Sequence, residues 1–189
     1  MESYNNLKMT MENKNQAAKA AEMIAEIAAK RTPESPNELN DFLECVEVKR
    51  NKVIVDGSCS LWENTFLEML PEIFKACAAL TNQKFEANAW YESCNCGYSA
   101  SIEAERRGST LNLRTVVSEN GDGICPECCE QIVCYDEYDP DETYYCPECG
   151  EEIDHEEMFG GELPVITKET FEIKQQVPIE RQVQSSPLL

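Results

Sequence analysis

"FEANAWYESCNCGYSASIEAERRGSTLNLRTVV" runs from Phe85 to Val117, and this stretch decides the fold. Apolar residues alternate with polar ones in three successive segments, a period of two that is typical of half-buried β-strands. The alternating positions are Phe85, Ala87, Ala89 and Tyr91, then Tyr98, Ala100, Ile102 and Ala104, then Leu111, Leu113 and Val117. Arg106-Arg107-Gly108-Ser109 supplies a turn between the last two segments. The stretch therefore predicts a meander of three antiparallel strands.

A helix is predicted immediately before the meander, over residues 61–81. Ser60 and Glu63 match a capping box, in which each side chain satisfies an otherwise unpaired backbone N–H. One apolar face follows at helical spacing, and its members are Trp62, Phe66, Leu70, Ile73, Cys77 and Leu80. Pro71 lacks a backbone N–H and clashes with the preceding turn, so we expect it to kink this helix or to break it in two.

Two further helices and two strand regions complete the predicted core. Residues 15–31 place Ala and Ile on one face at helical spacing, and residues 36–45 form a short helix with Ser35 as its N-cap. Residues 46–57 alternate around a polar tip and predict a hairpin, and a strand is expected from Val165 to Lys174. The fold class is α+β, with an antiparallel sheet made of the hairpin and the meander packed on helices.

The predicted organisation has four parts in chain order. An N-terminal helix and linker (1–35) precede the α+β core (36–118), which is followed by an acidic, cysteine-rich segment (119–162) and a C-terminal strand and tail (163–189). "ENGDG" at 119–123 is expected to be a flexible hinge between the core and the cysteine-rich segment. No internal repeat is found beyond two similar cysteine pairs.

The composition of the chain bears on its cellular compartment and on the role of its cysteines. Apolar residues make up 42% of the 189, which is enough for a packed core, but no apolar run approaches the roughly 20 residues of a membrane span. The polar start "MESYNNLKMTMENKN" lacks the pattern of a secretory signal. We therefore expect a cytoplasmic protein, in the host-cell cytoplasm if a phage or mobile element encodes it. Eleven cysteines in such a compartment indicate metal binding more than disulfides.

Two Cys-x-x-Cys pairs predict a metal site. Cys125 and Cys128 are separated by seventeen residues from Cys146 and Cys149, and four thiolates bind Zn²⁺ tetrahedrally at about 2.3 Å. The stretch from "CPEC" to "CPECG" resembles a zinc ribbon over residues 124–153. This resemblance implies that the two knuckles bind one structural Zn²⁺ through these four residues and that the strands between them form a hairpin.

The remaining cysteines leave alternatives open. Cys94, Cys96, Cys129 and Cys134 either form a second metal site or serve as packed or exposed thiols. Cys45, Cys59 and Cys77 lie in apolar patterns and are expected in the core. A rubredoxin-like iron centre is the alternative for the first site, since "YDP" and "CPECG" also occur in that family, although the interval between the knuckles here is shorter.

Catalytic motifs are not visible in the sequence. The single histidine, His155, lies among acidic residues with no adjacent nucleophile, and we expect it to be a solvated surface residue. An ion held by four thiolates has no open coordination position for water, so it is structural. The patterns of zinc deaminases, EF-hands and PD-ExK nucleases are each incomplete or fortuitous, and no Gly-rich phosphate-binding loop is present. We therefore expect a protein that is not an enzyme.

Charge is the strongest clue to function. The net charge is −20, and residues 116–167 hold sixteen Asp and Glu but no Lys or Arg. Such a segment repels a phosphate backbone, so direct nucleic-acid binding through the ribbon is disfavoured, and only Arg106-Arg107 and Arg114 offer a small basic patch. The acidity serves either solubility or attraction to a basic protein surface.

Two functional hypotheses follow. In the first, the ribbon binds a basic nucleic-acid-processing protein, as an inhibitor or nucleic-acid mimic of the anti-CRISPR or anti-restriction type, with no membrane involved. The expected partner-binding residues are Asp136, Glu137, Asp139, Asp141, Glu142, Glu151 and Glu152. In the second, the chain is a zinc-ribbon adaptor in a transcription, translation or replication assembly, recognised through apolar surfaces.

Overall fold

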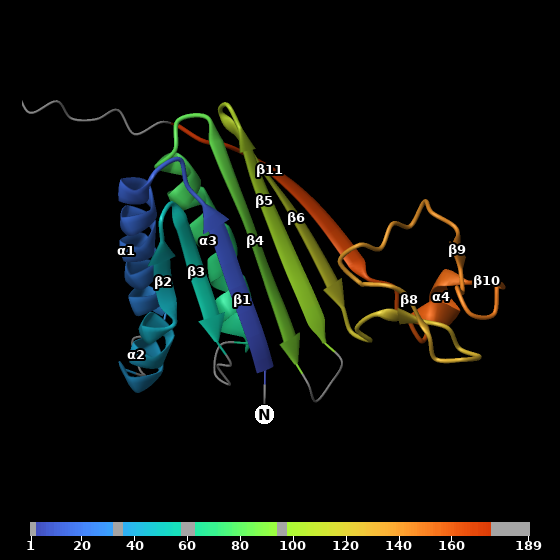
Figure 1. Ribbon diagram of the computed structural model, residues 1–189. Coiled ribbons are helices and arrows are strands. Elements are labelled where there is room, and N and C mark those ends of the chain that lie inside the picture. Colours follow the sequence, from blue (N-terminus) through green and yellow to red (C-terminus); the bar gives the residue numbers. More distant parts are fainter. Residues whose placement is uncertain (1–2, 32–35, 58–62, 94–97, 175–189) are drawn as a thin grey trace, which may run out of the picture.

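The computed structural model describes residues 3–31, 36–57, 63–93 and 98–174. Seven antiparallel strands form one sheet, with helices on one of its faces (Figure 1). The strands are β1 (Ser3–Thr10), β2 (Val46–Lys49), β3 (Lys52–Gly57), β4 (Lys84–Ser93), β5 (Ser99–Arg107), β6 (Thr110–Ser118) and β11 (Val165–Glu172). Their order across the sheet is β11-β6-β5-β4-β1-β3-β2. The expected α+β class is confirmed.

The meander and the hairpin are both present, and the strand that joins them was not predicted. β1 pairs antiparallel with β3 on one side and with β4 on the other. Its Leu7 and Met9 are fully buried among the core side chains. Only these two positions of "SYNNLKMT" are strongly apolar, and Asn is disfavoured in strands, so the segment gives a weak strand signal on its own. Pairing on both sides stabilises it.

Three helices cover the apolar face of the sheet. They are α1 (Lys14–Arg31), α2 (Pro36–Glu44) and α3 (Glu63–Ala79), each close to its predicted bounds. α3 continues through Pro71 as a single helix, so the predicted break is wrong. Met69, Leu70, Ile73 and Phe74 are all fully buried on either side of the proline, and this packing holds the helix together. The expected caps at Ser35 and Ser60 lie outside the described residues.

The other face of the sheet is polar. Strand pairing aligns Lys8, Asn88, Glu103, Arg114 and Lys168 in one row across β1, β4, β5, β6 and β11. Residues that are directly opposite each other in a sheet share a face, so this row lies opposite the helices. We call this surface the open face. The cysteine-rich segment packs against one end of it.

The cysteine-rich segment is inserted between β6 and β11, which are neighbours in the sheet. It contains β7 (Gly123–Ile124), β8 (Gln131–Val133), β9 (Tyr144–Tyr145), β10 (Glu152–Ile153) and α4 (His155–Met158). In Figure 1 it lies at the side of the sheet away from α1 and α2. We call residues 119–162 the acidic module.

Candidate metal centre

Each cysteine pair of the acidic module lies in a hairpin of its own. β7 pairs with β8 around Cys125 and Cys128, and β9 pairs with β10 around Cys146 and Cys149. The expectation that the strands between the two knuckles would pair with each other is therefore wrong. Hydrogen bonds within each knuckle explain the difference: Cys125 N–H donates to Glu130 O (2.8 Å) and Cys146 N–H donates to Glu151 O (2.9 Å). Each knuckle closes on its own flanking strands.

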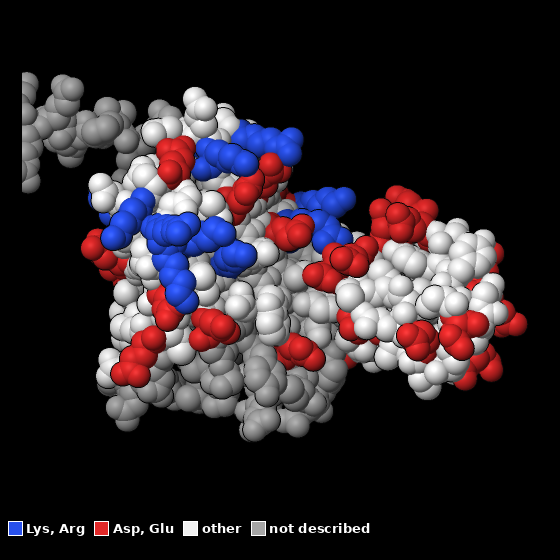
Figure 2. All heavy atoms as spheres, viewed as in Figure 1, with Lys and Arg blue, Asp and Glu red and all other residues white. Residues whose placement is uncertain are grey.

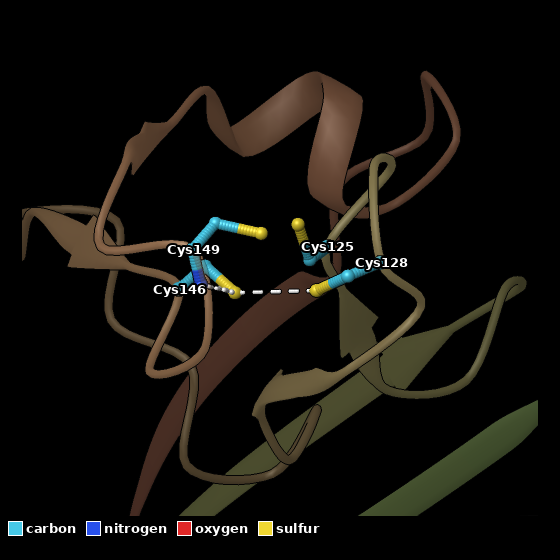
Figure 3. Close-up of side chains that lie close together, drawn as sticks. All are labelled: Cys125, Cys128, Cys146 and Cys149. Carbon is cyan, nitrogen blue, oxygen red and sulfur yellow. Dashed lines mark hydrogen bonds between the residues drawn. The ribbon is translucent and has the colours of Figure 1, made fainter.

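The two knuckles bring four sulfurs together. The Sγ atoms of Cys125, Cys128, Cys146 and Cys149 all lie within 4.8 Å of one another, and they point towards a common centre (Figure 3). A tetrahedral ion with bonds of about 2.3 Å requires sulfurs about 3.8 Å apart. Cys128 Sγ and Cys146 Sγ are 3.5 Å apart, so the cluster has dimensions suited to such an ion. The four residues fit a metal of the zinc type.

The backbone around the sulfurs favours thiolate at one ligand. The Cys149 N–H points at Cys146 Sγ (3.4 Å), and this interaction with the backbone lowers the pKa of the Cys146 thiol to about 7. Side-chain hydrogen bonds with Cys128 and Cys146 instead raise the pKa of Cys149 above its ordinary value. Four crowded sulfurs cannot all ionise without a cation between them, because like charges disfavour each other. A bound cation would remove this conflict.

The knuckles have the same backbone path but differ at one residue. Cys129 and Gly150 follow the second cysteine of their pairs, and both have positive φ, +61° and +73°. Their N–H groups donate to Cys125 O (2.9 Å) and Cys146 O (2.8 Å), respectively. Glycine adopts this conformation without steric cost, whereas cysteine adopts it at a steric cost because of its Cβ. The knuckle turn itself therefore accounts for the conformation of Cys129.

A small aromatic core supports the metal centre. Tyr138 stacks on Tyr144 with ring centroids 5.9 Å apart and contacts Phe159 edge-on at 5.1 Å. Beside the two inner cysteines Cys125 and Cys146, the buried members are Val133, Tyr138, Tyr144, Ile153, Met158 and Phe159. This core is separate from the one beneath the large sheet. So few side chains bury little apolar surface, and a metal would supply much of the module's stability.

His155 is part of this core and not a solvated surface residue, so that expectation is wrong. Its ring is half-buried and contacts Tyr138 and Tyr144 edge-on. Nε2 lies 2.9 Å from Glu142 O, which can only accept, so Nε2 carries a hydrogen; in the neutral imidazole, Nδ1 then accepts from the Tyr138 hydroxyl at 2.7 Å. The histidine thereby ties α4 to the loop between the knuckles. Acidic neighbours in the sequence conceal this structural role.

The acidic module is fixed to the sheet by polar contacts. Arg114, from the open face of β6, donates to Asp136 O (2.8 Å) and Tyr138 O (3.4 Å). Asn120 donates to Phe159 O (2.6 Å), and the Asp122 carboxylate accepts from Tyr135 N–H (3.1 Å). Residues 119–123 therefore do not form the free hinge that the sequence suggested.

Gly123 shows how closely this connection is packed. A Cβ placed on Gly123 would lie 2.9 Å from Val133 Cγ1, 3.0 Å from Met158 and 3.1 Å from Phe159. Glycine is required there for space, and the connection between sheet and module is part of the module's core.

The seven carboxylates predicted to bind a partner are all exposed. Five of them lie on the loop between the knuckles, and Glu151 and Glu152 follow the second knuckle. Figure 2 shows Lys and Arg side chains gathered over the sheet, whereas the module displays only acidic and uncharged side chains. The hollow between the module and the sheet has a volume of about 460 Å³ and is lined by both kinds of charge, including Arg114, Lys168, Asp139 and Asp141.

The residues of the predicted second metal site are not gathered in the described part of the chain. Cys129 is exposed in its knuckle, and the Cys134 sulfur accepts from Gln131 Nε2 at 2.9 Å. Among the described residues, the group at metal-binding distance contains neither. Cys94, Cys96 and Cys59 lie outside the described residues. Cys77 is buried as expected, and burial raises the pKa of its thiol to about 12, whereas Cys45 is partly buried against the same core.

Arg106 does not belong to a basic patch, contrary to expectation. Its side chain is 1% exposed and donates to the carbonyls of Ala78, Thr81 (2.7 Å) and Asn82 (3.3 Å), just beyond and at the end of α3. The C-terminal end of a helix carries partial negative charge, so a guanidinium beside it is stabilising. Arg107 pairs with Glu105 at 2.7 Å, and Arg114 contacts the module.

Comparisons with known proteins give no relative. No protein-family model matches the chain, and no curated protein and no solved structure matches it. No described helix is both long and apolar enough to cross a membrane. The likeness to a zinc ribbon therefore rests on the four clustered cysteines and on the backbone that presents them.

Proposed function

We propose that the acidic module is a zinc-stabilised binding surface for a basic protein that processes nucleic acid, and that the chain acts as an inhibitor or nucleic-acid mimic without catalysis of its own. One observation carries the proposal: the sixteen carboxylates of residues 116–167 occur without a single Lys or Arg. Four thiolates on Zn²⁺ add a net charge of −2, which gives this stretch about −18. Such a surface attracts a cationic groove at high rates.

The arrangement of the module supports this function. The predicted contact residues are exposed, while Tyr138, Tyr144 and His155 hold the loop that carries most of them. Binding through an ordered surface avoids the entropic cost of ordering a free acidic segment. The contacts of Arg114 with the loop backbone keep the surface in place relative to the sheet.

Zinc is the metal we propose for the centre. Four thiolates in tetrahedral geometry select zinc or iron, and zinc requires no redox partner. Metal analysis of the purified chain is expected to give one zinc per chain, and replacing Cys128 or Cys149 by Ser should abolish it. One iron per chain, with the visible absorption of an iron-thiolate centre, would instead identify a rubredoxin-like site.

Charge reversal tests the binding function. The test variant carries Glu137→Lys, Asp141→Lys and Glu142→Lys. Asp139 is left unchanged because its Oδ1 accepts a hydrogen bond from Asp141 N–H (2.9 Å). The control carries Glu22→Lys, Glu26→Lys and Glu68→Lys, which make the same charge change on exposed positions of α1 and α3. Immobilised chains are exposed to cell lysate at low salt and eluted with NaCl or duplex DNA, and the proteins released are identified by mass.

We expect the wild-type chain and the control to retain basic nucleic-acid-binding proteins and to release them with either salt or DNA. The test variant should lose them while keeping its zinc. Retention that withstands high salt and is unaffected by the three reversals would contradict the proposal.

An adaptor function is the second candidate, and the exposed apolar side chains favour it. Among the described residues, Ile124, Tyr145, Leu163 and Val165 are 42%, 56%, 41% and 63% exposed, and all four lie in or beside the module. An adaptor would bind its partner through exposed apolar side chains, which mark protein contact sites where they form one patch. Replacement of Tyr145 and Val165 by Ser should then abolish retention, with little influence of salt.

A further inference from the structure

We propose that two copies of this chain pair through the free edge of β11, which joins their sheets into one antiparallel sheet. β11 ends the strand order and pairs only with β6 among the described strands. Most of its eight residues are exposed, and it contains no proline. A long, unprotected edge strand presents a row of unpaired N–H and C=O groups that another strand can satisfy.

The backbone alternation of β11 identifies the groups that point away from β6. Ile173 N–H donates to Ser109 O (2.7 Å), which continues the β11–β6 register by one residue. In an antiparallel ladder, residues alternate between bonding to the neighbour and pointing away from it. Odd-numbered residues of β11 therefore bond to β6. The N–H and C=O groups of Ile166, Lys168, Thr170 and Glu172 point to the edge.

Charge favours one register among those centred on residues 168 to 171, and it makes β11 complementary to a second copy of itself. With Thr170 opposite Thr170 of the second copy, Lys168 faces Glu172 of the other chain on both sides of the two-fold axis. Moving the axis to residue 168, 169 or 171 brings Lys168 against Lys168, Glu169 against Glu169 or Lys168 against Lys174. Opposite charges across a strand pair are stabilising and like charges are destabilising. The sequence of β11 is thus complementary to itself in this register.

The acidic module adds a second complementary contact. In the same register, Lys174 of one copy lies opposite Ile166 of the other. Ile166 lines the hollow of about 460 Å³ between the sheet and the module, together with Glu137, Asp139 and Asp141. The lysine would extend along the open face towards these carboxylates. The helices of both copies lie on the same side of the joined sheet, because the two-fold axis is perpendicular to it.

A charge swap tests both the pairing and its register. Lys168→Glu alone and Glu172→Lys alone each place like charges opposite each other twice, so both should be monomeric in sedimentation equilibrium at micromolar concentrations. The wild-type chain and the double variant Lys168→Glu with Glu172→Lys should be dimers. Lys168 and Glu172 are both exposed in a single copy, so circular dichroism should show the same fold for all variants.

Backbone pairing has its own test. Thr170→Pro removes an N–H that points to the edge and leaves the bonds to β6, so it should yield a folded monomer. In the wild-type dimer, amide hydrogen exchange should be slow at residues 168, 170 and 172 and should accelerate on dilution. A wild-type chain that stays monomeric, which would leave the edge to a strand of another protein, overturns the proposal. So does a dimer that survives both single reversals.

Discussion

At the scale of single residues, backbone conformation and burial separate residues that look alike in the sequence. Cys129 and Gly150 occupy the same turn of the two knuckles with φ values of +61° and +73°. A Cβ on Gly150 would meet nothing within 4 Å, so conformation alone favours glycine there.

Single substitutions at these two positions should change the stability of the knuckles in opposite directions. Gly150→Ala should destabilise the metal-bound module by about 1 kcal/mol, because a side chain is disfavoured in the left-handed region. Cys129→Gly should stabilise it by a similar amount and should leave the metal content at its wild-type value. Competition for zinc with a chelator, followed for both variants, measures the two effects. Loss of metal in Cys129→Gly would show that Cys129 is itself a ligand.

Glu12 shows a pH-dependent contribution to stability. Its carboxylate accepts from the N–H groups of Asn82 (2.8 Å) and Gln83 (3.0 Å). Desolvation of this largely exposed carboxylate opposes ionisation, but the backbone hydrogen bonds and a side-chain hydrogen bond from Gln16 prevail and lower its pKa to about 2. A lowered pKa means that the contribution is complete above the ordinary value of 4.5 and is lost as the pH falls towards 2.

We therefore expect Glu12→Gln to lower the free energy of unfolding by about 1 kcal/mol at pH 7, since the group is exposed and partly screened. Below pH 4.5 the difference from wild type should shrink. Urea unfolding at several pH values measures it, with Glu22→Gln as the control for charge alone. A difference that does not vary with pH would exclude the carboxylate as its origin.

The type of a residue reveals less about its structural role than its environment in the fold does. Arg106 and Arg107 are adjacent, yet the first is buried against carbonyls at the end of α3 and the second pairs at the surface. His155 lies in an acidic run but contacts two tyrosines. These roles depend on residues distant in the chain, and one sequence does not contain that information. The four clustered cysteines could be predicted because local spacing alone identifies them.

At the scale of elements, alternation predicted strands wherever both faces differ clearly in polarity. β4, β5, β6, β11 and the β2–β3 hairpin meet that condition. β1 does not, because its two buried apolar residues stand among polar ones. Its stability comes from two neighbours that are distant in the sequence, so local pattern could not reveal it. The pairing within each knuckle was missed for a similar reason, since strand identity does not specify the partner strand.

A matched pair of substitutions tests the importance of β1. Leu7 is fully buried, whereas Lys8 lies on the open face. Leu7→Ala should lower the free energy of unfolding by about 2–5 kcal/mol through lost burial and the cavity left behind. Lys8→Ala should change it by no more than about 0.5 kcal/mol. Denaturant unfolding followed by tryptophan fluorescence compares the two, and equal effects would mean that β1 is not part of the core.

At the scale of the whole molecule, the two hydrophobic cores are distinct. One lies between the sheet and its helices, and the other lies inside the acidic module. Only the second core includes cysteines of the metal centre, Cys125 and Cys146. Stability should therefore be divided between a part that depends on metal and a part that does not.

Removing the metal should unfold the module alone. After chelation, amides of β7 to β10 should exchange rapidly with solvent, because four uncoordinated thiols cannot replace the ion. Amides of β1, β4 and β5 should keep their protection, since α1 and α3 still cover them. Hydrogen exchange by mass spectrometry distinguishes the two regions, and adding zinc should reverse the change. Uniform loss of protection would mean that the sheet depends on the metal as well.

The position of the module in the chain has a consequence for how such a protein can diversify. Val117 and Val165, which flank it, are direct partners in the β6–β11 ladder. Because the backbone leaves and rejoins the sheet at one pair of opposite residues, a short turn or an unrelated domain could be inserted between them without altering the sheet. The same sheet could thus carry different inserted domains, and partner recognition by the insert could evolve separately from the sheet that supports it.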